Sequence, residues 1–299
     1  MNVEFYLFDV DHGQCAALKL PNGRWCLFDA GCTSSFSPIR WIVSQGSFYG
    51  KSFLNGFLNE VSFKFYMATI SHFHGDHLAD WQNLFKYGPE FIRTVQPDKG
   101  YVDDCKSTST EESWPVVSQF IESVRANYSG SAMPDYGGVR ISEMSLPVAI
   151  ARQIGGDANA RVNNASIVTR IDVFGNSILL CGDVMKDAWA EITKIPSWQR
   201  LVSNIDVLVA PHHGHSSGYS NGLLKIAKPA VVLVSAVSRD PNVDGRYSLD
   251  PVRGITIGGT PYGYISTRQK GHIKITINPP QAGFSKGKRN WSFGDDVTR

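Results

Sequence analysis

The sequence lacks the patterns that mark secreted and membrane-spanning chains. Its first residues, MNVEFYLFDV, do not show the charged start, apolar run and small-residue cleavage site of a signal peptide. No apolar stretch approaches the roughly 18 residues needed to cross a bilayer. The five cysteines are odd in number and show no CxxC spacing, which argues against a disulfide framework and predicts reduced thiols. We therefore expect a cytoplasmic protein with no membrane partner, and the sequence indicates no protein partner.

A large excess of charge of one sign is also missing. The 299 residues carry a formal net charge of +2, and 19% of them are charged. A strongly basic balance would favour nucleic acid as a partner, whereas this weak balance neither supports nor excludes it. The hydrophobic share of 42% is enough for a sizeable core. Because no segment resembles a linker, we predict one domain over residues 1–278 and a tail at 279–299.

Strand-like runs alternate with helical patterns along the chain, which predicts an α/β layered fold. The runs EFYLFDV, CAALKL and RWCLFDA near the start read as strands, with an Asn22-Gly23 turn between the last two. Later strands are expected at 61–70, 146–154, 165–174, 177–181, 205–210 and 230–236, and a final hairpin at 262–277. Helices are expected at 76–86, 114–127, 185–195 and 221–227. The segment at about 84–155 is predicted to be an insertion near the mouth of a site.

Six of the eight histidines lie in two short clusters, SHFHGDH and PHHGH. The first cluster directly follows a strand-like run that ends in TIS. In an extended segment alternate residues face the same way, so His72 and His74 can reach one ion together. A turn at Gly75 then directs Asp76 and His77 toward a second ion. Because imidazole and carboxylate are common ligands of zinc-like metals, this cluster predicts a two-metal site.

The HxHxDH spacing after a strand resembles the signature of the metallo-β-lactamase superfamily. The resemblance extends to the branch of that family that contains the β-lactamase-like domain of the DNA-uptake protein ComEC, also called Rec2. The segments FDVDHGQC, NNASIV, ILLCGD, PHHGHSS and GHIKI follow the branch's order of motifs. They cover residues 3–83 and 160–277, with Asp11 in place of a usual glycine. The resemblance implies a four-layer αββα sandwich of two mixed sheets with flanking helices.

The resemblance also implies which residues complete the metal site. The family expects an acidic residue that bridges both ions at the end of a later strand, and Asp183 stands there. It expects a late histidine after another strand, where His212 and His213 both stand. We favour His213 as the ligand, which leaves His212 to contact the substrate or to protonate the leaving group. In this branch an asparagine, here Asn163 or Asn164, stands in place of a third histidine.

Two divalent ions, Zn²⁺ or Mn²⁺, are therefore the expected cofactors. An amide oxygen is a harder and weaker ligand than imidazole, so the first position should accept Mn²⁺ as readily as Zn²⁺. The asparagine pair also suits a simple loop turn, and Asp183 also suits the N-cap of the next helix. The predicted metal ligands are His72, His74, Asp76, His77, Asn163, Asp183 and His213.

Three more residues beside these motifs are candidates for substrate contact. His12 follows the first strand and suits either the lining of the site or a simple turn. His215 and Ser216 follow the HHG motif. His272, by contrast, lies in a strand pattern and is expected to be structural.

The resemblance implies a binuclear metal-dependent hydrolase that uses a metal-bound hydroxide, with Asp76 and His212 as catalytic residues. A phosphodiesterase, and within that class a nuclease, follows from the branch and from the suitability of two-metal chemistry for displacement at phosphorus. Nucleic acid or another phosphodiester is then the expected substrate. A hydrolase of small esters, such as a phosphocholine ester, a lactone or a thioester, is the second hypothesis. A binding module that keeps its metals for structure alone is the third.

Overall fold

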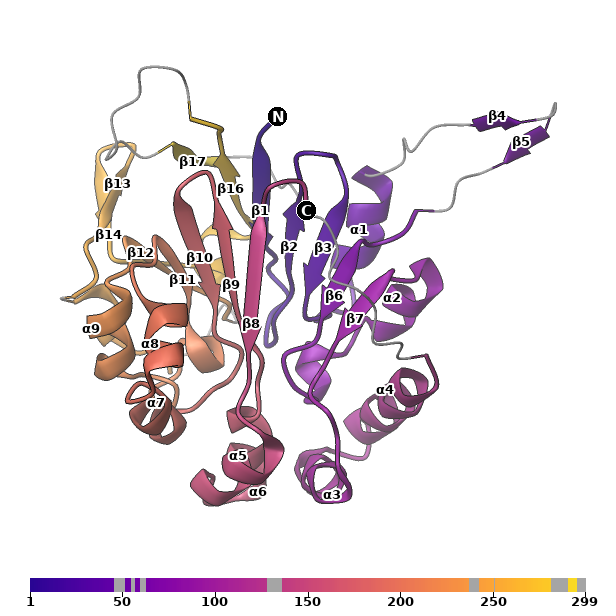
Figure 1. Ribbon diagram of the computed structural model, residues 1–299, viewed down its shortest axis with the longest axis horizontal. Coiled ribbons are helices and arrows are strands. Elements are labelled where there is room, and N and C mark those ends of the chain that lie inside the picture. The colour runs from indigo at the N-terminus through magenta and orange to yellow at the C-terminus, as the bar shows by residue number, and fades with distance from the viewer. Residues whose placement is uncertain are drawn as a thin grey trace.

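Two β-sheets face each other at the centre of the molecule, with helices on both outer sides (Figure 1). The structure is a computed structural model, and it describes residues 1–45, 52–54, 57–59, 63–127, 136–236, 242–249, 251–280 and 290–294. Helix, sheet, sheet and helix therefore form four layers. This arrangement confirms the α/β class and the αββα sandwich predicted above.

The first sheet has seven strands in the order β17-β16-β1-β2-β3-β6-β7. The β3–β6 and β6–β7 pairs are parallel, and the other pairs are antiparallel. The strands of this sheet are β1 (Val3–Leu7), β2 (Ala16–Lys19), β3 (Trp25–Phe28), β6 (Met67–Thr69), β7 (Phe91–Arg93), β16 (Ile273–Ile277) and β17 (Trp291–Gly294).

The second sheet has six strands in the order β15-β12-β11-β10-β9-β8. Its strands are β8 (Arg140–Met144), β9 (Val168–Val173), β10 (Asn176–Leu180), β11 (Val207–Val209), β12 (Val231–Val234) and β15 (Tyr264–Ser266). The pairs from β10 to β15 are parallel, and β8 and β9 complete the sheet in antiparallel pairs. Two small ribbons stand apart, formed by β4 (Ser52–Leu54) with β5 (Phe57–Asn59) and by β13 (Ile255–Ile257) with β14 (Thr260–Tyr262).

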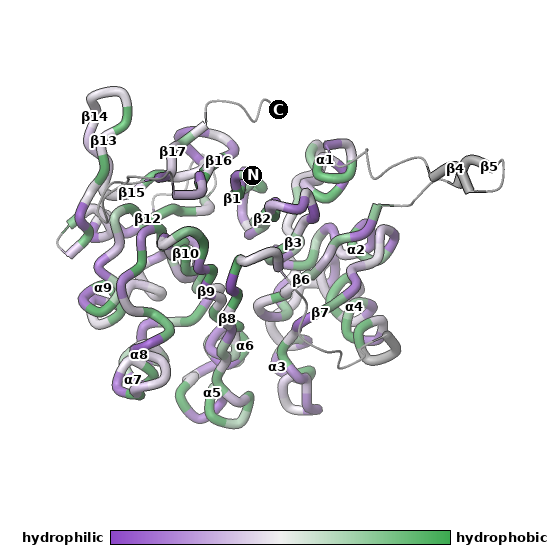
Figure 2. Tube along the Cα trace, turned by 45° about the horizontal axis from the view of Figure 1, so that its top comes forward, coloured by the Kyte–Doolittle hydropathy of each residue, from purple (hydrophilic) through white to green (hydrophobic). Residues whose placement is uncertain are grey.

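Alternation along the strands explains why both faces of each sheet are covered. In β1, Phe5 and Leu7 belong to the core between the two sheets, whereas Tyr6 belongs to the core beneath the helices. Successive strand residues point to opposite faces, so a run that is apolar at every position predicts burial on both sides. In β10, the last three residues are Ile178, Leu179 and Leu180, and all five residues of the strand are buried (Figure 2). The runs of valine, isoleucine and leucine thus specify a sandwich covered by helices.

The helices divide between the two outer sides and one end of the sandwich (Figure 1). Beside the seven-stranded sheet lie α1 (Pro38–Gln45), α2 (Trp81–Tyr87) and α4 (Ser113–Asn127). Beside the six-stranded sheet lie α7 (Lys186–Ile192), α8 (Pro196–Val202) and α9 (Asn221–Ala227). At one end lie α3 (Lys99–Thr108), α5 (Val148–Ile154) and α6 (Ala158–Asn164). The short helices are α10 (Thr267–Lys270) and the 3₁₀ turns η1 (Gly75–His77), η2 (Pro211–Gly214) and η3 (Gly245–Ser248).

Most of the predicted elements are present, but three were wrong in type or extent. The expected strand at 146–154 is helix α5, because Pro147 directly precedes it and the residues after Val148 include the good helix formers Ala151 and Arg152. The expected hairpin at 262–277 is instead β15, α10 and β16, which carry the chain from one sheet to the other. The expected helix at 76–86 is split into η1 and α2. Between them, the Asp80 backbone N–H donates to the Ala30 carbonyl at 2.7 Å and not to a carbonyl of the preceding turn.

Two segments expected to lie outside the main fold contribute strands to it. The region 84–155, predicted as an insertion, supplies β7 to one sheet and β8 to the other. Within the predicted tail, β17 pairs with β16 in antiparallel register. The expected strand at 61–70 begins partly outside the described residues, and its described part contains β6.

The five cysteines agree with the expectation of reduced thiols. All five cysteines are free thiols, and Cys15, Cys26 and Cys181 are buried in the core. In the described parts of the chain, no helix is both long enough and apolar enough to cross a membrane.

Candidate metal centre

The histidine clusters and Asp183 meet because each follows the carboxyl end of a central strand. The segment 71–77 follows β6, Asp183 follows β10, and η2 follows β11. His12 lies in the loop that follows β1. The carboxyl ends of neighbouring strands converge at one edge of a sheet, where sites of α/β proteins usually lie. Here strand ends from both sheets supply residues to one site.

An inner group of three side chains, His72, His77 and Asp183, forms the buried part of this site. Their potential ligand atoms all lie within 4.8 Å of one another. His72 Nε2 is 3.8 Å from Asp183 Oδ2, and His77 Nε2 is 3.4 Å from Asp183 Oδ1. The side chains of the two histidines are fully buried, and that of Asp183 is 4% exposed. This group therefore presents two imidazole nitrogens and a carboxylate to a space that is shielded from solvent.

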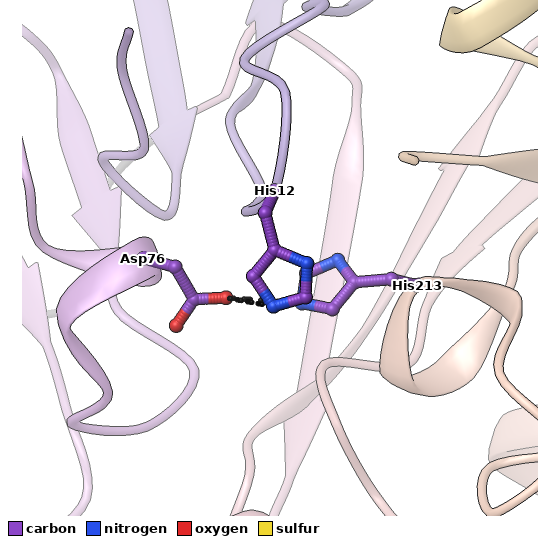
Figure 3. A group of neighbouring side chains, drawn as sticks. All are labelled: His12, Asp76 and His213. Carbon is purple, nitrogen blue, oxygen red and sulfur yellow. Dashed lines mark ion pairs between the residues drawn. The ribbon is translucent and has the colours of Figure 1, made fainter. Parts of the chain in front are cut away.

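An outer group of three side chains, His12, Asp76 and His213, lies beside it (Figure 3). His213 Nε2 is 3.2 Å from Asp76 Oδ2, and His12 Nε2 is 3.7 Å from the same oxygen. The three residues come from three separate segments and point toward one another. Unlike the inner group, it is open on one side, because the His12 side chain is 66% exposed.

The inner and outer groups are in direct contact. His77 Nε2 lies 3.3 Å from His213 Nε2, and Asp183 Oδ2 lies 3.4 Å from His213 Nε2. His77 Nε2 also lies 3.7 Å from Asp76 Oδ2. Asp183 thus contacts histidines of both groups, as a carboxylate shared by two adjacent cations would.

These donor atoms fit divalent metal ions. Nitrogen and carboxylate oxygen in sets of three suit zinc and manganese, which leave open positions in catalytic sites. The buried Asp183 Oδ1 makes no hydrogen bond to the described residues, although His77 Nε2 lies 3.4 Å from it. A buried acceptor without a partner is costly, and two imidazole Nε2 atoms 3.3 Å apart need a shared proton or cation between them. Metal ions would satisfy both requirements.

The charges in the site influence one another strongly. Burial lowers the pKa of His72 and of His74. Burial also opposes charge on His213, but Asp183 and Asp76 outweigh it and raise the pKa of His213 to about 9. Asp183 likewise outweighs burial at His77 and raises its pKa. Without metal, protonated imidazoles therefore neutralise the carboxylates. A bound cation would displace the protons of these imidazoles.

Asp29 holds His77 in place, and the sequence analysis did not identify it. His77 Nδ1 donates to Asp29 Oδ2 at 2.9 Å, which directs Nε2 toward the site. The same carboxylate accepts the Ser71 backbone N–H at 2.6 Å and the Gln14 side-chain amide at 3.0 Å. Such carboxylate–histidine pairs orient metal ligands and raise their basicity. The available signal was an aspartate near the end of the run RWCLFDA, but its partners His77 and Ser71 are more than forty residues away in the sequence.

Glycines allow the loops of the site to approach each other closely. A Cβ on Gly13 would lie 2.5 Å from the Asp76 carbonyl oxygen, and a Cβ on Gly31 would lie 2.8 Å from it. Gly13 also has a φ of +143°, which side-chain-bearing residues rarely adopt. The Asp76 main chain is therefore packed between two loops, one of which carries His12.

His74 lies beside His72, and the asparagine pair lies at the end of α6. His74 Nδ1 lies 3.1 Å from His72 Nε2, and Thr108 Oγ1 lies 3.4 Å from His74 Nε2. Asn163 and Asn164 are buried at the end of α6 and not in a simple turn. The Asn164 oxygen accepts the Met185 backbone N–H at 3.1 Å, whereas the Asn163 amide has no hydrogen-bond partner in the described structure. Asn163 is thus the asparagine whose oxygen is available for an ion.

The second histidine cluster is held in an unusual backbone conformation. His212 and His213 both have positive φ, 49° and 53°, which costs residues with side chains of order 1–3 kcal/mol each. This turn directs His213 Nε2 into the outer group, and it leaves His212 Nε2 4.0 Å from Asp183 Oδ2. Strain of this kind persists where the surrounding structure requires a particular side-chain direction.

Ser217, which the sequence analysis did not single out, fixes the protonation pattern of His212. The Ser217 backbone N–H donates to His215 Nδ1 at 3.1 Å, so that nitrogen is an acceptor and also receives the Ser217 hydroxyl proton. The Ser217 oxygen then accepts from His212 Nδ1 at 2.5 Å. The neutral His212 ring therefore presents its Nε2 lone pair to the site. His215 contacts Ser217, which in turn contacts His212, and Ser216 is exposed.

His272 has a structural role, as expected. Its Nδ1 accepts the Asp9 backbone N–H at 2.8 Å, and its ring packs against Phe36. It thereby holds the loop that follows β1.

No protein-family model matches the chain. The chain is 26% identical over 238 residues to ComE operon protein 3 of Bacillus subtilis, which covers 78% of this chain. It spans 28% of the length of that relative, so the activity of the whole relative does not transfer to it.

The chain is also similar to solved structures, at low sequence identity. The metallo-β-lactamase fold protein YhfI of Bacillus subtilis is 12% identical, with a TM-score of 0.40 over 78% of this chain and 86% of that one. The short form of human tRNase Z is 14% identical, with a TM-score of 0.38 over 80% and 94%. The diiron β-hydroxylase CmlA of Streptomyces venezuelae is 14% identical, with a TM-score of 0.44 over 88% and 47%. By its layers and the placement of its motifs, the chain has the metallo-β-lactamase fold and resembles ComE operon protein 3.

Proposed function

We propose that this protein is a binuclear metal-dependent hydrolase that cleaves phosphodiesters, with nucleic acid as its substrate. The observation that carries the proposal is the contact of two His/Asp groups through Asp183, His77 and His213. In the proposed site, the inner group holds one ion together with His74 and Asn163. Asp76 and His213 hold the second.

The bound ions would supply positive charge that acidifies a water molecule and stabilises the attacked phosphate. The protein's own residues determine where that chemistry takes place. Asp29 fixes the ring of His77, and the packing of Gly13 and Gly31 fixes the main chain of Asp76. Asp76 holds the attacking water in line by accepting its hydrogen bond. Its pKa stays below the usual range, because His77 and His213 outweigh the opposing effect of burial, so it remains an acceptor.

His212 is the proposed proton carrier. Burial lowers the pKa of His212, so its ring is neutral. Because Nδ1 donates its proton to Ser217, Nε2 is available as an acceptor. It could therefore donate to a leaving oxygen only after Nε2 had accepted a proton, which the attacking water would supply. Nε2 would then pass this proton to the oxygen that departs from phosphorus.

Phosphodiester chemistry is favoured over other ester hydrolysis for two reasons. Two adjacent cations can stabilise both the attacking and the leaving oxygen of an in-line displacement at phosphorus. The outer edge of the site is open at His12, which leaves room for a substrate that extends beyond the reacting group. The similarity to ComE operon protein 3 supports the same choice.

A cleavage assay tests the proposal. The purified protein is incubated with linear DNA, plasmid DNA and RNA in the presence of Mn²⁺, Zn²⁺ or EDTA. The variant Asp76→Ala runs beside it, with Asp187→Ala as the control, because Asp187 is an exposed aspartate on the first turn of α7. Cleavage that needs metal, is lost in Asp76→Ala and persists in Asp187→Ala supports a nuclease. If the metal-loaded protein leaves every nucleic acid intact, the proposed nuclease activity is wrong. Hydrolysis of small esters is then the alternative, and chromogenic phosphodiesters, lactones and thioesters are the substrates that test it.

A further inference from the structure

We propose that His12 is a ligand of the outer ion, and that its exposure lets this ion exchange with solvent while the inner ion stays bound. The inference rests on the proposed function, since it assigns one more residue to the second metal position. It concerns a histidine in the loop after β1, which is far from the other proposed ligands in the sequence.

The geometry of the outer group supports this role. His12 Nε2 lies 3.7 Å from Asp76 Oδ2, and the ring centroids of His12 and His213 are 5.1 Å apart. One ligand atom from each of these residues lies within 4.8 Å of the others. Figure 3 shows the three side chains converging from separate segments. With His12, the outer position has three ligands of its own, and Asp183 and His77 complete its inner side.

The backbone that carries His12 is fixed, although its side chain is exposed. The Gly13 carbonyl accepts the Ser235 hydroxyl at 2.6 Å, and the Gly31 N–H donates to the Gln14 carbonyl at 2.9 Å. Asp11 has a φ of 56°, and the φ of +143° at Gly13 continues the turn. The turn made by Asp11 and Gly13 thus directs His12 toward Asp76.

Exposure distinguishes this ligand from the inner ones. The His12 side chain is 66% exposed, whereas His72 and His77 are fully buried and His77 is also bonded to Asp29. Release of His12 from an ion would restore its contact with water at little cost. Release of the inner ion would instead require a proton to enter the buried site and pair His77 with Asp183. The outer ion should therefore leave first, by way of His12.

Metal titration tests the inference independently of catalysis. The metal-free full chain is titrated with Mn²⁺ or Co²⁺ in competition with a chelator, and bound metal is determined by elemental analysis. We expect two equivalents in the wild type, one released by chelator before the other. In His12→Ala, the weaker equivalent should bind at least about tenfold less tightly, while the tighter one is unchanged. His12→Gln, which keeps a polar side chain of similar reach, should behave in the same way.

The control is His215→Ala, which removes another partly exposed histidine outside both groups and should retain two equivalents. If His12→Ala binds both ions as the wild type does, the inference is wrong and the proposed function stands. If the wild type releases both ions together, the exchange claim is wrong. If the wild type binds no divalent ion, the proposed function itself fails.

Discussion

The inner and outer metal groups contain similar residues in very different surroundings. The inner group is buried, and Asp29 fixes its histidine orientation through a network that also includes Ser71 and Gln14. The outer group is open to solvent at His12, and its geometry depends on two loops, one after β1 and one after β11. One site can thus combine a metal position formed by core residues with a metal position formed by loops. The core-built position should bind tightly, and the loop-built position should exchange.

Asp183 is the residue that joins the two groups, so its loss should have the largest effect. Asp183→Ala removes the carboxylate that lies within 4.0 Å of three histidines from both groups. We expect both ions to be lost and hydrolysis to fall to background. The loss of affinity should exceed the roughly 10–100-fold that changes outside the ligand shell cost. Elemental analysis after dialysis measures this, and retention of one tightly bound ion would contradict a shared carboxylate.

Asp29→Asn should weaken the inner position selectively. Asparagine tolerates the positive φ of this residue, so the backbone can persist while the carboxylate that accepts from His77 is lost. We expect the affinity for the tighter ion to fall about 10–100-fold, with a smaller change at the weaker one. Competition with a chelator measures both. The control Asp172→Asn alters a carboxylate bonded to Arg140 and Arg170, and it should leave both affinities unchanged. An equal loss at both positions in Asp29→Asn would remove the distinction drawn above.

Gly13→Ala should disturb the outer position and the stability of the loop. Its Cβ would meet the Asp76 carbonyl oxygen at 2.5 Å, and the backbone φ is +143°. We expect a loss of about 1–3 kcal/mol in unfolding free energy from strain, together with weaker binding of the outer ion. The control is Gly138→Ala, which also has positive φ but no atom within 4 Å of the added Cβ. Chemical denaturation measures the backbone strain in both variants, and metal titration measures the effect of the contact with Asp76. Equal metal binding in both variants would contradict the packing argument.

The smallest expected effect is on the pH dependence of the metal-free protein. Asp183 and Asp76 raise the pKa of His213 to about 9 from an ordinary value of 6.5, against the effect of burial. Since the folded value is the higher one, the stability from protonated His213 is fully present below pH 6.5 and is lost as the pH rises through about 9. A bound ion replaces that proton, so the metal-loaded protein should show less decline. Thermal unfolding across this range, with and without metal, measures it. A decline that is equal in both forms would argue against His213 as a ligand.

The sequence was most informative where a motif is local. The run SHFHGDH and the PHHGH turn identified residues that the structure brings together, and the strand before Gly182 placed Asp183 beside them. Asp29 could not be recognised in this way, because its role depends on Ser71 and His77, which join it only in the folded chain. The position of His12 beside Asp76 has the same origin, since it depends on β1 and β6 lying in one sheet.

Errors in the fold prediction also arose from long-range pairing. The chain from 262 to 277 contains two short apolar runs that suit a hairpin, but each run pairs with a distant strand of a different sheet. The strand β17 was missed because its partner β16 supplies the register that the polar tail sequence does not reveal.

The most direct test of two unequal metal positions is an anomalous difference map from crystals of the protein grown with Mn²⁺ or Zn²⁺. We expect two peaks, one among His72, His77 and Asp183 and one among His12, Asp76 and His213, with the outer peak lost first when a chelator is added. A single peak, or two peaks of which the inner one is lost first, would contradict the account.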